Sequence, residues 1–429
     1  MTPSDLNHSA SATALDTDHA PADDVRPLQP STQAMHADDY LNRTADVAPP
    51  LHVSTTYAYP HEPKDLVPAN HLDLETFEGY IYSRMTAPNA TRLEAILSTL
   101  LKGRALTYSS GLAAIHAAYV FLNPKRISIG DGYHGSHGVI DLHRKLTGAK
   151  KLPLDCPASE LHEGDVIHLE TPLNPTGEAL NIAAFAEKAH SREAVLLVDA
   201  TFGPPGLQDP FAFGADIVMH SGTKYLGGHS DMLCGVLAVR SKDIFWGLYN
   251  ERVYLGSVMG SLEGWLGARS LRTLELRVQR QSQNASSLVA WLNALLHPDQ
   301  ASSGQDPSLS SGNAAMVGKT VERIAHASLQ ATDMDWLSKQ MPNGYGPVFA
   351  LWMQGEELAR RLPSKLRLFH HATSLGGVES LVEWRRMSDA GCDPRLLRIS
   401  VGVEHWEDLR DDLLHGFKAL ADEIGKGLP

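Results

Sequence analysis

The chain has 429 residues, of which 43% are hydrophobic and 20% charged, a composition typical of a folded protein with a large core and room for two domains. Its formal net charge of −13 disfavours a nucleic-acid-binding surface, which needs a basic patch. No stretch approaches the roughly 20 consecutive apolar residues that cross a bilayer, so a membrane-spanning protein is not expected.

The cysteine and histidine spacings predict neither disulfides nor a metal site. Cys156, Cys234 and Cys392 are far apart and form no CxxC pair, and the 21 histidines show no HExxH pattern. The N-terminus lacks the basic and apolar regions of a secretory signal and is too acidic for a typical transit peptide. We therefore expect a cytoplasmic protein.

The first predicted element is a disordered tail over residues 1–45, which are rich in Ser, Thr, Ala, Asp and Pro and show no hydrophobic period. Residues 46–92 are expected to form an extended arm. A long helix is predicted after Pro88, with Asn89 as its N-cap, because apolar residues follow at helical spacing from Arg92 onward.

Short apolar runs alternate with turns and helical stretches through the middle of the chain. This repetition predicts a mainly parallel sheet covered by helices, whose chemistry lies at the carboxyl ends of the strands. The candidate site residues all follow such runs. The runs are residues 105–108, 126–130, 165–170, 194–199 and 216–219.

The last third of the chain predicts a smaller mixed α/β domain. Residues 297–313 are rich in Pro, Ser and Gly and are expected to form a surface loop insertion. Strands are predicted over residues 344–353 and 396–402, followed by a terminal amphipathic helix. We therefore divide the folded part of the chain into residues 93–270 and 271–429.

The most informative segment is Asp216–Asp231, which places Lys224 among glycines and the hydroxyls of Ser221 and Thr223. A surface turn is the alternative interpretation. However, an earlier apolar run ends in Asp199, and a lysine paired with such an acid is typical of pyridoxal phosphate (PLP) enzymes. The lysine forms a Schiff base with the aldehyde, and the acid keeps the pyridine nitrogen protonated. The hydroxyls are candidate phosphate ligands.

Two further segments are candidate phosphate sites. Ser110, Gly111 and Leu112 lie between a predicted strand and a predicted helix, where backbone N–H groups bind anions, although a plain helix N-cap is the alternative. Tyr82 and Arg84 are two residues apart, so in an extended strand they face the same side and can reach one phosphate.

Three single residues complete the candidate site. Tyr133 follows a glycine in a turn, where its ring either stacks on the cofactor or packs as an ordinary tyrosine. Asn174 is either a turn residue or a cofactor contact. Arg398 lies in an apolar strand pattern, where a guanidinium needs an acidic partner, either a substrate carboxylate or a structural salt bridge.

Together these segments resemble the PLP enzymes of cysteine and methionine metabolism, which include cystathionine γ-synthases, cystathionine lyases and acylhomoserine sulfhydrylases. The resemblance covers roughly residues 46–425. Its motifs, in order, are Tyr82-Ser-Arg84, Ser109-Ser-Gly-Leu-Ala-Ala114, Glu170-Thr-Pro-Leu-Asn-Pro175, Val198-Asp-Ala-Thr-Phe202, Ser221-Gly-Thr-Lys-Tyr225, Arg269-Ser-Leu-Arg-Thr-Leu274, Ser374-Leu-Gly-Gly-Val-Glu-Ser-Leu381 and Arg398-Ile-Ser-Val-Gly-Val-Glu404.

The resemblance implies an α/β protein of PLP-dependent transferase fold type I. Its large domain would hold a mostly parallel seven-stranded sheet, and its C-terminal domain would be a smaller α/β unit. The implied assembly is a homotetramer, a dimer of dimers with each site shared across a dimer, acting on small amino-acid substrates with no nucleic-acid or membrane partner.

The resemblance also implies a role for each candidate residue. Lys224 would be the Schiff-base lysine and proton shuttle, and Asp199 would pair with the pyridine nitrogen. Tyr133 would stack on the ring and assist elimination, while Asn174, Ser374 and Arg398 would bind the substrate. The implied phosphate ligands are Ser110, Gly111, Leu112, Ser221 and Thr223, with Tyr82 and Arg84 arriving from the neighbouring subunit.

Three positions depart from the family pattern. Residues 87–89 read Ala-Pro-Asn where the family has Asn-Pro-Thr, and His134 replaces a glycine after Tyr133. Members that handle cystathionine often carry Glu immediately before Ser374, where this chain has Thr373. Because that glutamate is expected to meet a distal amino group, its absence disfavours cysteine as the nucleophile. Either His134 compensates for the missing acid, or the acceptor is sulfide, another thiol or a carbon nucleophile.

The sequence therefore predicts γ-replacement on an O-acyl-L-homoserine, as in cystathionine γ-synthases. After the substrate amine displaces Lys224, this lysine would remove the Cα proton before the Cγ substituent leaves. Elimination from cystathionine by a β- or γ-lyase reaction is the alternative. A catalytically silent PLP-fold protein is a remote one.

Overall fold

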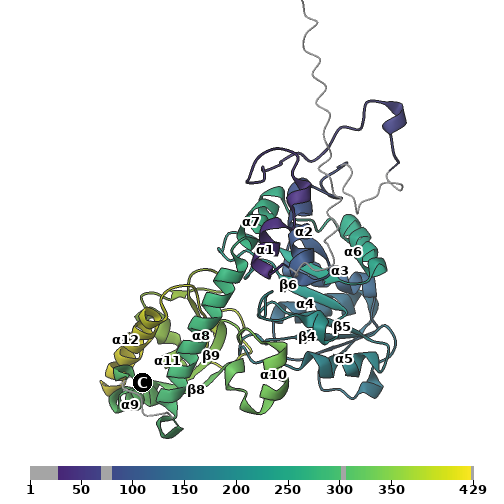
Figure 1. Cartoon of the computed structure of the whole chain (residues 1–429). Helices are drawn as coiled ribbons and strands as arrows, with labels where there is room; N and C mark the ends of the chain where they lie inside the picture. The colour runs from purple at the N-terminus through teal and green to yellow at the C-terminus, as the bar shows by residue number, and fades with distance from the viewer. Residues whose placement is uncertain (1–27, 69–79, 301–305, 427–429) are drawn as a thin grey trace, which may run out of the picture.

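The computed structural model describes residues 28–68, 80–300 and 306–426 of the chain. Figure 1 shows two α/β bodies, each built on one sheet, with the long helix α8 (Leu274–Leu296) running from one body to the other. No helix in the described ranges is both long enough and apolar enough to span a membrane.

The larger body contains the predicted seven-stranded sheet. Its strand order is β1-β7-β6-β5-β4-β2-β3, and β7 runs in the direction opposite to the other six strands. The strands are β1 (Arg104–Tyr108), β2 (Arg126–Ile129), β3 (Lys150–Pro153), β4 (Val166–Glu170), β5 (Val195–Asp199), β6 (Ile217–Ser221) and β7 (Gly235–Val239).

Burial explains why these runs form a sheet with covered faces. Every residue of β4 and β7 is buried, as expected where helices pack on both sides of a strand. β3 lies at the sheet edge and exposes Lys150 and Lys151, charges that protect an edge against pairing with another chain. The helices of this body are α2 (Pro88–Leu101), α3 (Gly111–Leu122), α4 (His134–Thr147), α5 (Ile182–His190), α6 (Lys242–Leu255) and α7 (Ser261–Leu271).

The smaller body holds a five-stranded sheet in the order β10-β11-β12-β9-β8. Its strands are β8 (Val321–Ala325), β9 (Val348–Met353), β10 (His370–His371), β11 (Leu381–Trp384) and β12 (Leu396–Ser400). A core of its own, formed largely by α8, α12, β9 and β12, lies beneath this sheet. The helices are α9 (Ser311–Thr320), α11 (Glu356–Arg361) and α12 (Trp406–Gly425), while α10 (Met334–Gln340) packs on the core of the larger body through Leu337.

Part of the predicted N-terminal tail is folded, so its boundary at residue 45 is wrong. Helix α1 (Pro30–His36) and the 3-10 turn η1 (Asp39–Leu41) pack on the larger body. The buried Asp38 accepts hydrogen bonds from Arg92 and Arg272, at 2.6 Å and 2.7 Å. Two arginines distant in sequence thus hold this segment, a pairing that composition does not reveal. Residues 1–27 lie outside the described residues.

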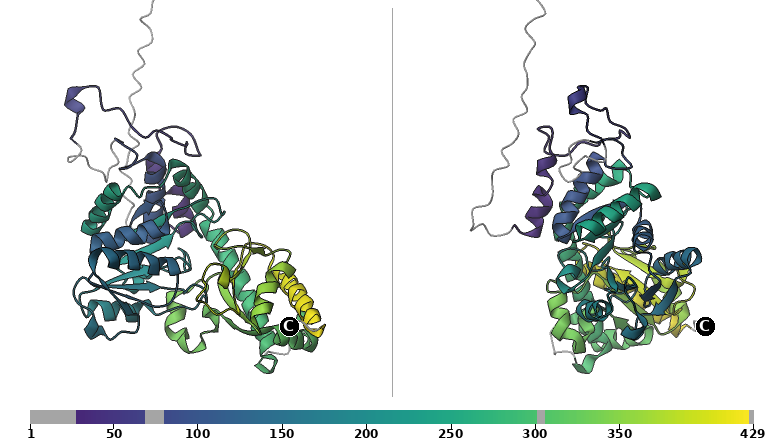
Figure 2. Two further views of the ribbon diagram at one scale, coloured as in Figure 1. Left: turned by 180° about the vertical axis from the view of Figure 1, so that it is seen from behind. Right: turned by 90° about the vertical axis from the view of Figure 1, so that its right-hand side faces the viewer.

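The arm and the following helix also differ from prediction. α2 begins at Pro88, so the arm ends before residue 92. Ala87 is the N-cap residue in place of Asn89, whose side chain instead bonds His52 N and Pro50 O in the arm. Figures 1 and 2 show the arm running outward, away from both sheets.

Two predictions in the smaller body also need correction. The strand predicted from residue 344 begins at Val348, because Gly344 and Gly346 adopt positive φ values of 133° and 93°, which interrupt an extended strand. The predicted loop ends before residue 313, because α9 begins at Ser311 with Ser310 as its N-cap. Residues 301–305 of that loop lie outside the described residues.

Candidate active site

The candidate site is a cavity of about 460 Å³ at the carboxyl ends of the parallel strands, where the smaller body meets the larger one. The chain reaches it immediately after β1, β2, β4, β5 and β6, as expected for an open α/β sheet. The predicted site residues that line it are Ser110, Gly111, Leu112, Tyr133, Asn174, Asp199, Ser221, Thr223, Lys224, Ser374 and Arg398.

The N-terminus of α3 forms one wall of the cavity. Ser110 is the N-cap, and its side chain accepts a hydrogen bond from Ala113 N at 3.1 Å. The backbone N–H groups of Gly111 and Leu112 belong to the first turn, which has no carbonyl partners within the helix. A Cβ on Gly111 would lie 3.0 Å from the Met219 methyl group and 3.3 Å from Ser221 Cβ. The N-cap interpretation is therefore confirmed, and the start of the helix faces the cavity, where phosphate binding stays a prediction.

Lys224 lies at the junction of the two bodies. Its Nζ donates a hydrogen bond to Ser374 Oγ at 2.7 Å. Burial, assisted by the positive charge of Arg398, lowers the pKa of Lys224 to about 8. The amine therefore has a substantial neutral fraction near physiological pH, which a surface lysine lacks.

A tight turn holds Ser374 beside that lysine. Ser374 has a φ of 76°, a left-handed conformation that a non-glycine residue rarely adopts. Gly376 has a φ of 82°, and a Cβ there would lie 2.8 Å from Tyr225 N. Only glycine therefore lets this turn approach the backbone of the lysine so closely.

Asp199 is buried at the end of β5, and its Oδ1 accepts two hydrogen bonds from one residue. They come from Thr201 N at 3.0 Å and Thr201 Oγ1 at 2.6 Å. Burial raises the pKa of Asp199, because the carboxylate has lost its water. A cationic ring nitrogen at this carboxylate would offset that cost, so the residue fits a protonated pyridine. The same Thr201 hydroxyl accepts a hydrogen bond from Ser221 N at 2.9 Å and so links the end of β5 to the end of β6, just before Lys224.

Glu170 is a second buried acid, to which sequence reasoning gave no role. Its two carboxylate oxygens accept hydrogen bonds from Tyr133 N and Asn174 N, each at 2.8 Å. Glu170 therefore fixes the turns that follow β2 and β4. A Cβ on Gly132 would lie 2.5 Å from Glu170 Oε2. Burial, together with the charge of Asp199, raises the pKa of Glu170. Its position at the end of a buried strand was the signal that could have identified it.

Arg398 forms the structural salt bridge that the sequence left as one alternative, and its contact with a substrate carboxylate stays a prediction. It lies opposite Glu383 in the β11–β12 pair and forms a salt bridge with it at 2.6 Å. It also lines the cavity, where its Nη1 donates to Asn174 Oδ1 at 3.1 Å and its Nη2 donates to Ser374 O at 2.7 Å. The guanidinium is thus oriented from both bodies. Its partner Glu383 was not identified from the sequence.

Tyr82 and Arg84 do not line this cavity in their own chain. Tyr82 forms an isolated bridge with Thr56, and residues 83–85 form a turn, so the extended segment expected here does not continue through Arg84. The Arg84 guanidinium lies 5.3 Å from the centre of the Tyr82 ring, and its Nη1 donates to Val253 O. The two side chains are nevertheless neighbours, and their contribution to a neighbouring subunit's site stays a prediction.

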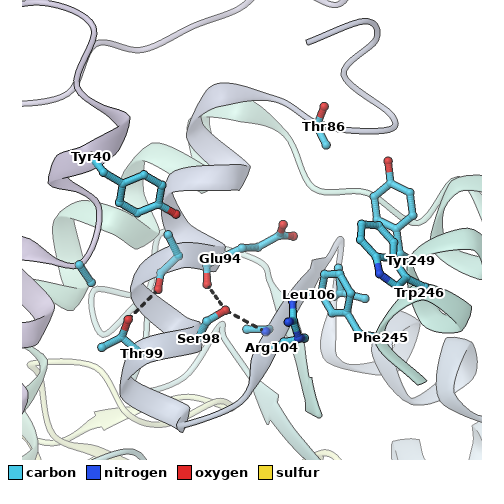
Figure 3. Close-up of a pocket in the computed structure, with 13 residues that line it drawn as sticks. Tyr40, Thr86, Glu94, Ser98, Thr99, Arg104, Leu106, Phe245, Trp246 and Tyr249 are labelled. Carbon is cyan, nitrogen blue, oxygen red and sulfur yellow. Dashed lines mark hydrogen bonds between the residues drawn. The ribbon is translucent and has the colours of Figure 1, made fainter. Parts of the chain in front are cut away.

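A second cavity, of about 280 Å³, lies between η1, α2 and α6 and is lined by Tyr40, Phe245, Trp246 and Tyr249 (Figure 3). Its acid, Glu94, already accepts Thr107 N, Thr107 Oγ1 and an Arg252 guanidinium N–H. The Ser98 and Thr99 hydroxyls donate to main-chain carbonyls of α2. These engaged groups do not make a catalytic site, so we assign the chemistry to the first cavity.

Comparison with known proteins agrees with this geometry. Residues 31–418 match the model of the Cys/Met metabolism PLP-dependent enzymes. The chain is 31% identical to cystathionine γ-synthase of Escherichia coli over 397 residues, which are 87% of this chain and 93% of that protein. It is 30% identical to cystathionine γ-lyase of Bacillus subtilis over 391 residues, 86% and 94% of the two chains.

A solved structure shows the same likeness in three dimensions. The methionine γ-lyase CalE6 of Micromonospora echinospora superimposes with a TM-score of 0.76 at 31% identity, covering 91% of this chain and 99% of that one. The described fold, the lysine and the buried acid that line one cavity, and the match over most of the chain agree. The chain therefore belongs to the Cys/Met metabolism family of PLP-dependent enzymes, and its cofactor is pyridoxal phosphate.

Proposed function

We propose that the protein catalyses γ-replacement on an O-acyl-L-homoserine, in the manner of cystathionine γ-synthases. The observation that carries this proposal is that the acids in the cavity wall are already engaged and none stands at position 373. Both oxygens of Glu170 accept backbone N–H groups, and Asp199 is the candidate partner of the cofactor nitrogen. Thr373 also lines this wall. An ester tail needs no acid there, whereas a distal ammonium does. Cystathionine carries that ammonium and so does incoming cysteine, so the wall favours an ester donor and leaves open whether the acceptor is cysteine or another nucleophile.

Four side chains would provide the catalytic functions. Bound pyridoxal phosphate supplies an aldehyde that captures amino groups and a ring that withdraws electrons from Cα. Asp199 would hold the ring nitrogen protonated, and Tyr133 would lie against the ring. Lys224 would hold the cofactor, then take the Cα proton on Nζ and return a proton during replacement, with Ser374 Oγ orienting that nitrogen.

The remaining residues would bind the substrate and the phosphate. Arg398 would bind the α-carboxylate, since Asn174 and Ser374 already orient its guanidinium. The phosphate would lie at the start of α3, against the N–H groups of Gly111 and Leu112. Its other ligands would be Ser110, Ser221 and Thr223, with Tyr82 and Arg84 of a neighbouring subunit.

We also propose a homotetramer whose sites are shared across each dimer. Its support is the arm, which leaves its own body and exposes Val47, Val53 and Tyr59. Large exposed side chains on an extended segment favour contact with another copy. Light scattering of the purified protein tests the assembly, and a monomer would contradict it.

Cystathionine cleavage is the second candidate, because relatives with about 30% identity include cystathionine β- and γ-lyases as well as γ-synthases. The test is mass spectrometry of the products formed from O-acetyl- and O-succinyl-L-homoserine, with and without cysteine. Cystathionine formed only with cysteine supports γ-replacement. Release of 2-oxobutyrate alone supports Cγ elimination with a different acceptor, and no turnover favours the lyase reaction.

Two variants sharpen this test. Thr373→Glu introduces the acid that relatives handling cystathionine often carry at this position, and it should shift the acceptor preference toward cysteine. An unchanged preference would show that Thr373 does not determine the choice of acceptor. Lys224→Ala should abolish every reaction. Full biological activity of that variant would revive the interpretation as a silent PLP-fold protein.

A further inference from the structure

The active-site cavity contains a second buried guanidinium, that of Arg385. This residue begins the 3-10 turn η11 (Arg385–Met387) immediately after β11, and it lines the cavity with only 3% of its surface exposed. Its Nη1 donates to Glu383 Oε2 at 2.8 Å. Its Nε is buried and has no hydrogen-bond partner among the residues that the structure describes. A buried donor without a partner is costly, so this guanidinium is available to a ligand.

The charges around Arg385 do not balance. Glu383 Oε2 forms ion pairs with both Arg385, at 2.8 Å, and Arg398, at 2.6 Å. One carboxylate is therefore shared by two guanidinium groups. Arg398 and Glu383 alone would compensate each other across the β11–β12 pair. Glu383 alone therefore leaves one positive charge without an ion pair. Glu170 lines the same cavity and feels the charge of Arg385, but its oxygens accept backbone N–H groups. Burying such a charge is unfavourable unless an anion joins it.

The two arginines are held by different contacts. Arg398 is tied to Asn174 and to Ser374, the residue that also binds Lys224, so it faces the reacting end of a substrate. Arg385 has neither contact and comes from a separate turn. The cavity also contains the acids Glu170 and Asp199, but Glu170 accepts two backbone N–H groups and Asp199 is bonded to Thr201. The unpartnered Nε of Arg385 is therefore the donor left for an anionic group of the substrate.

We propose that Arg385 binds a second carboxylate, carried by the leaving group of the substrate. The preferred donor is then a homoserine ester of a dicarboxylic acid, such as O-succinyl-L-homoserine, over an acetyl ester. The inference rests on the proposed γ-replacement for the identity of the donor. Recognition of a distal carboxylate by Arg385 can be measured by binding alone.

The binding test uses two unreactive amino acids of matched length, L-2-aminononanedioate with a terminal carboxylate and L-2-aminononanoate with a terminal methyl group. The first places its carboxylate seven atoms beyond Cα, as O-succinyl-L-homoserine does. Each is titrated into the PLP-loaded protein while the cofactor absorbance is recorded. The wild type should prefer L-2-aminononanedioate. Arg385→Gln should weaken binding of L-2-aminononanedioate by about 10- to 100-fold, the range expected for a hydrogen bond to a charged group, and leave that of L-2-aminononanoate nearly unchanged.

Arg386→Gln is the matched control, because Arg386 lies in the same turn but is exposed and bonds only Ala390 O among described residues. It should leave both affinities unchanged, and Arg385→Lys should retain part of the preference. An equal loss for both ligands in Arg385→Gln would overturn the proposal, since Arg385 would then support the α-carboxylate or the fold. A wild type that does not distinguish the ligands would overturn it too.

Kinetics separate this inference from the proposed function. If γ-replacement is correct, Arg385→Gln should lower kcat/KM for O-succinyl-L-homoserine by a similar factor and change the value for O-acetyl-L-homoserine little. If neither ester is turned over, the proposed function fails, while the ratio of the two binding constants still decides the role of Arg385.

Discussion

Lys224 Nζ donates a 2.7 Å hydrogen bond to Ser374 Oγ, although the two residues are 150 positions apart. Lys224 follows a strand of the seven-stranded sheet, whereas Ser374 lies between β10 and β11 of the five-stranded sheet. The Lys224 amine is therefore oriented by the second body, and the geometry of the cavity depends on how the two bodies pack.

The low pKa of Lys224 predicts how cofactor loading depends on pH. Only the neutral amine attacks the aldehyde, so the rate at which cofactor-free protein binds pyridoxal phosphate should rise with pH and level off above about 8. Stopped-flow absorbance measures this profile. A rate that keeps rising to pH 10 would mean that the pKa is that of an ordinary lysine.

Arg398 contributes to that shift, so Arg398→Gln should move the midpoint of the loading profile to higher pH. The sign follows because a nearby positive charge favours the neutral amine, and its removal favours the ammonium form. Arg395→Gln is the control, since Arg395 precedes the same strand but pairs with Asp393 and Glu322 near the surface. A midpoint that moves equally in both variants would contradict the assignment.

Asp199→Asn tests the proposed pairing with the cofactor nitrogen. The variant keeps the shape and the Oδ1 contacts with Thr201 but removes the charge, so activity should fall by about 100- to 1,000-fold. Because burial raises the pKa of Asp199 when no cation is present, the cofactor-free variant should be at least as stable as the wild type. Thermal unfolding with and without cofactor checks this, and a cofactor-free variant that melts earlier would indicate a structural role.

Gly111→Ala tests the close approach at the start of α3. The added Cβ would lie 3.0 Å from the Met219 methyl group, so we expect weaker binding of pyridoxal phosphate, measured as a higher Kd. Gly138→Ala in α4 is the matched control, because nothing lies within 4 Å of its Cβ. That variant should keep the Kd and gain up to about 1 kcal/mol of helix stability. Equal Kd values for both variants would contradict the assignment.

Asp38→Ala tests the anchoring of the N-terminal segment. Removing the buried carboxylate leaves Arg92 and Arg272 without it, so the free energy of unfolding should fall by about 3–5 kcal/mol. Urea denaturation measures the change. Asp39→Ala removes a neighbouring exposed carboxylate and should have little effect, and equal changes in the two variants would rule out the buried anchor.

Strand patterns and the site at their carboxyl ends could be predicted from the sequence, because both depend on short-range signals. Buried runs such as Val195–Asp199 and Ile217–Ser221 mark strands by their own composition. Parallel strands bring the residues after them to one edge, so the order of the runs alone was enough to place Asp199 and Lys224 together. The position of Ser110 at the same edge could be predicted in the same way, because it follows the apolar run of residues 105–108.

The contacts that only the tertiary structure decided are those between elements distant in the chain. Composition predicted that residues 1–45 form a disordered tail. It could not reveal that Asp38 is anchored, because the partners of Asp38 lie on α2 and just after α7. Arg385 is one of two adjacent arginines in the sequence, and packing alone buries it while Arg386 stays exposed. Local pattern determines which segments become strands and helices. The burial of a given charge, and the partner it finds, depend on how those segments pack.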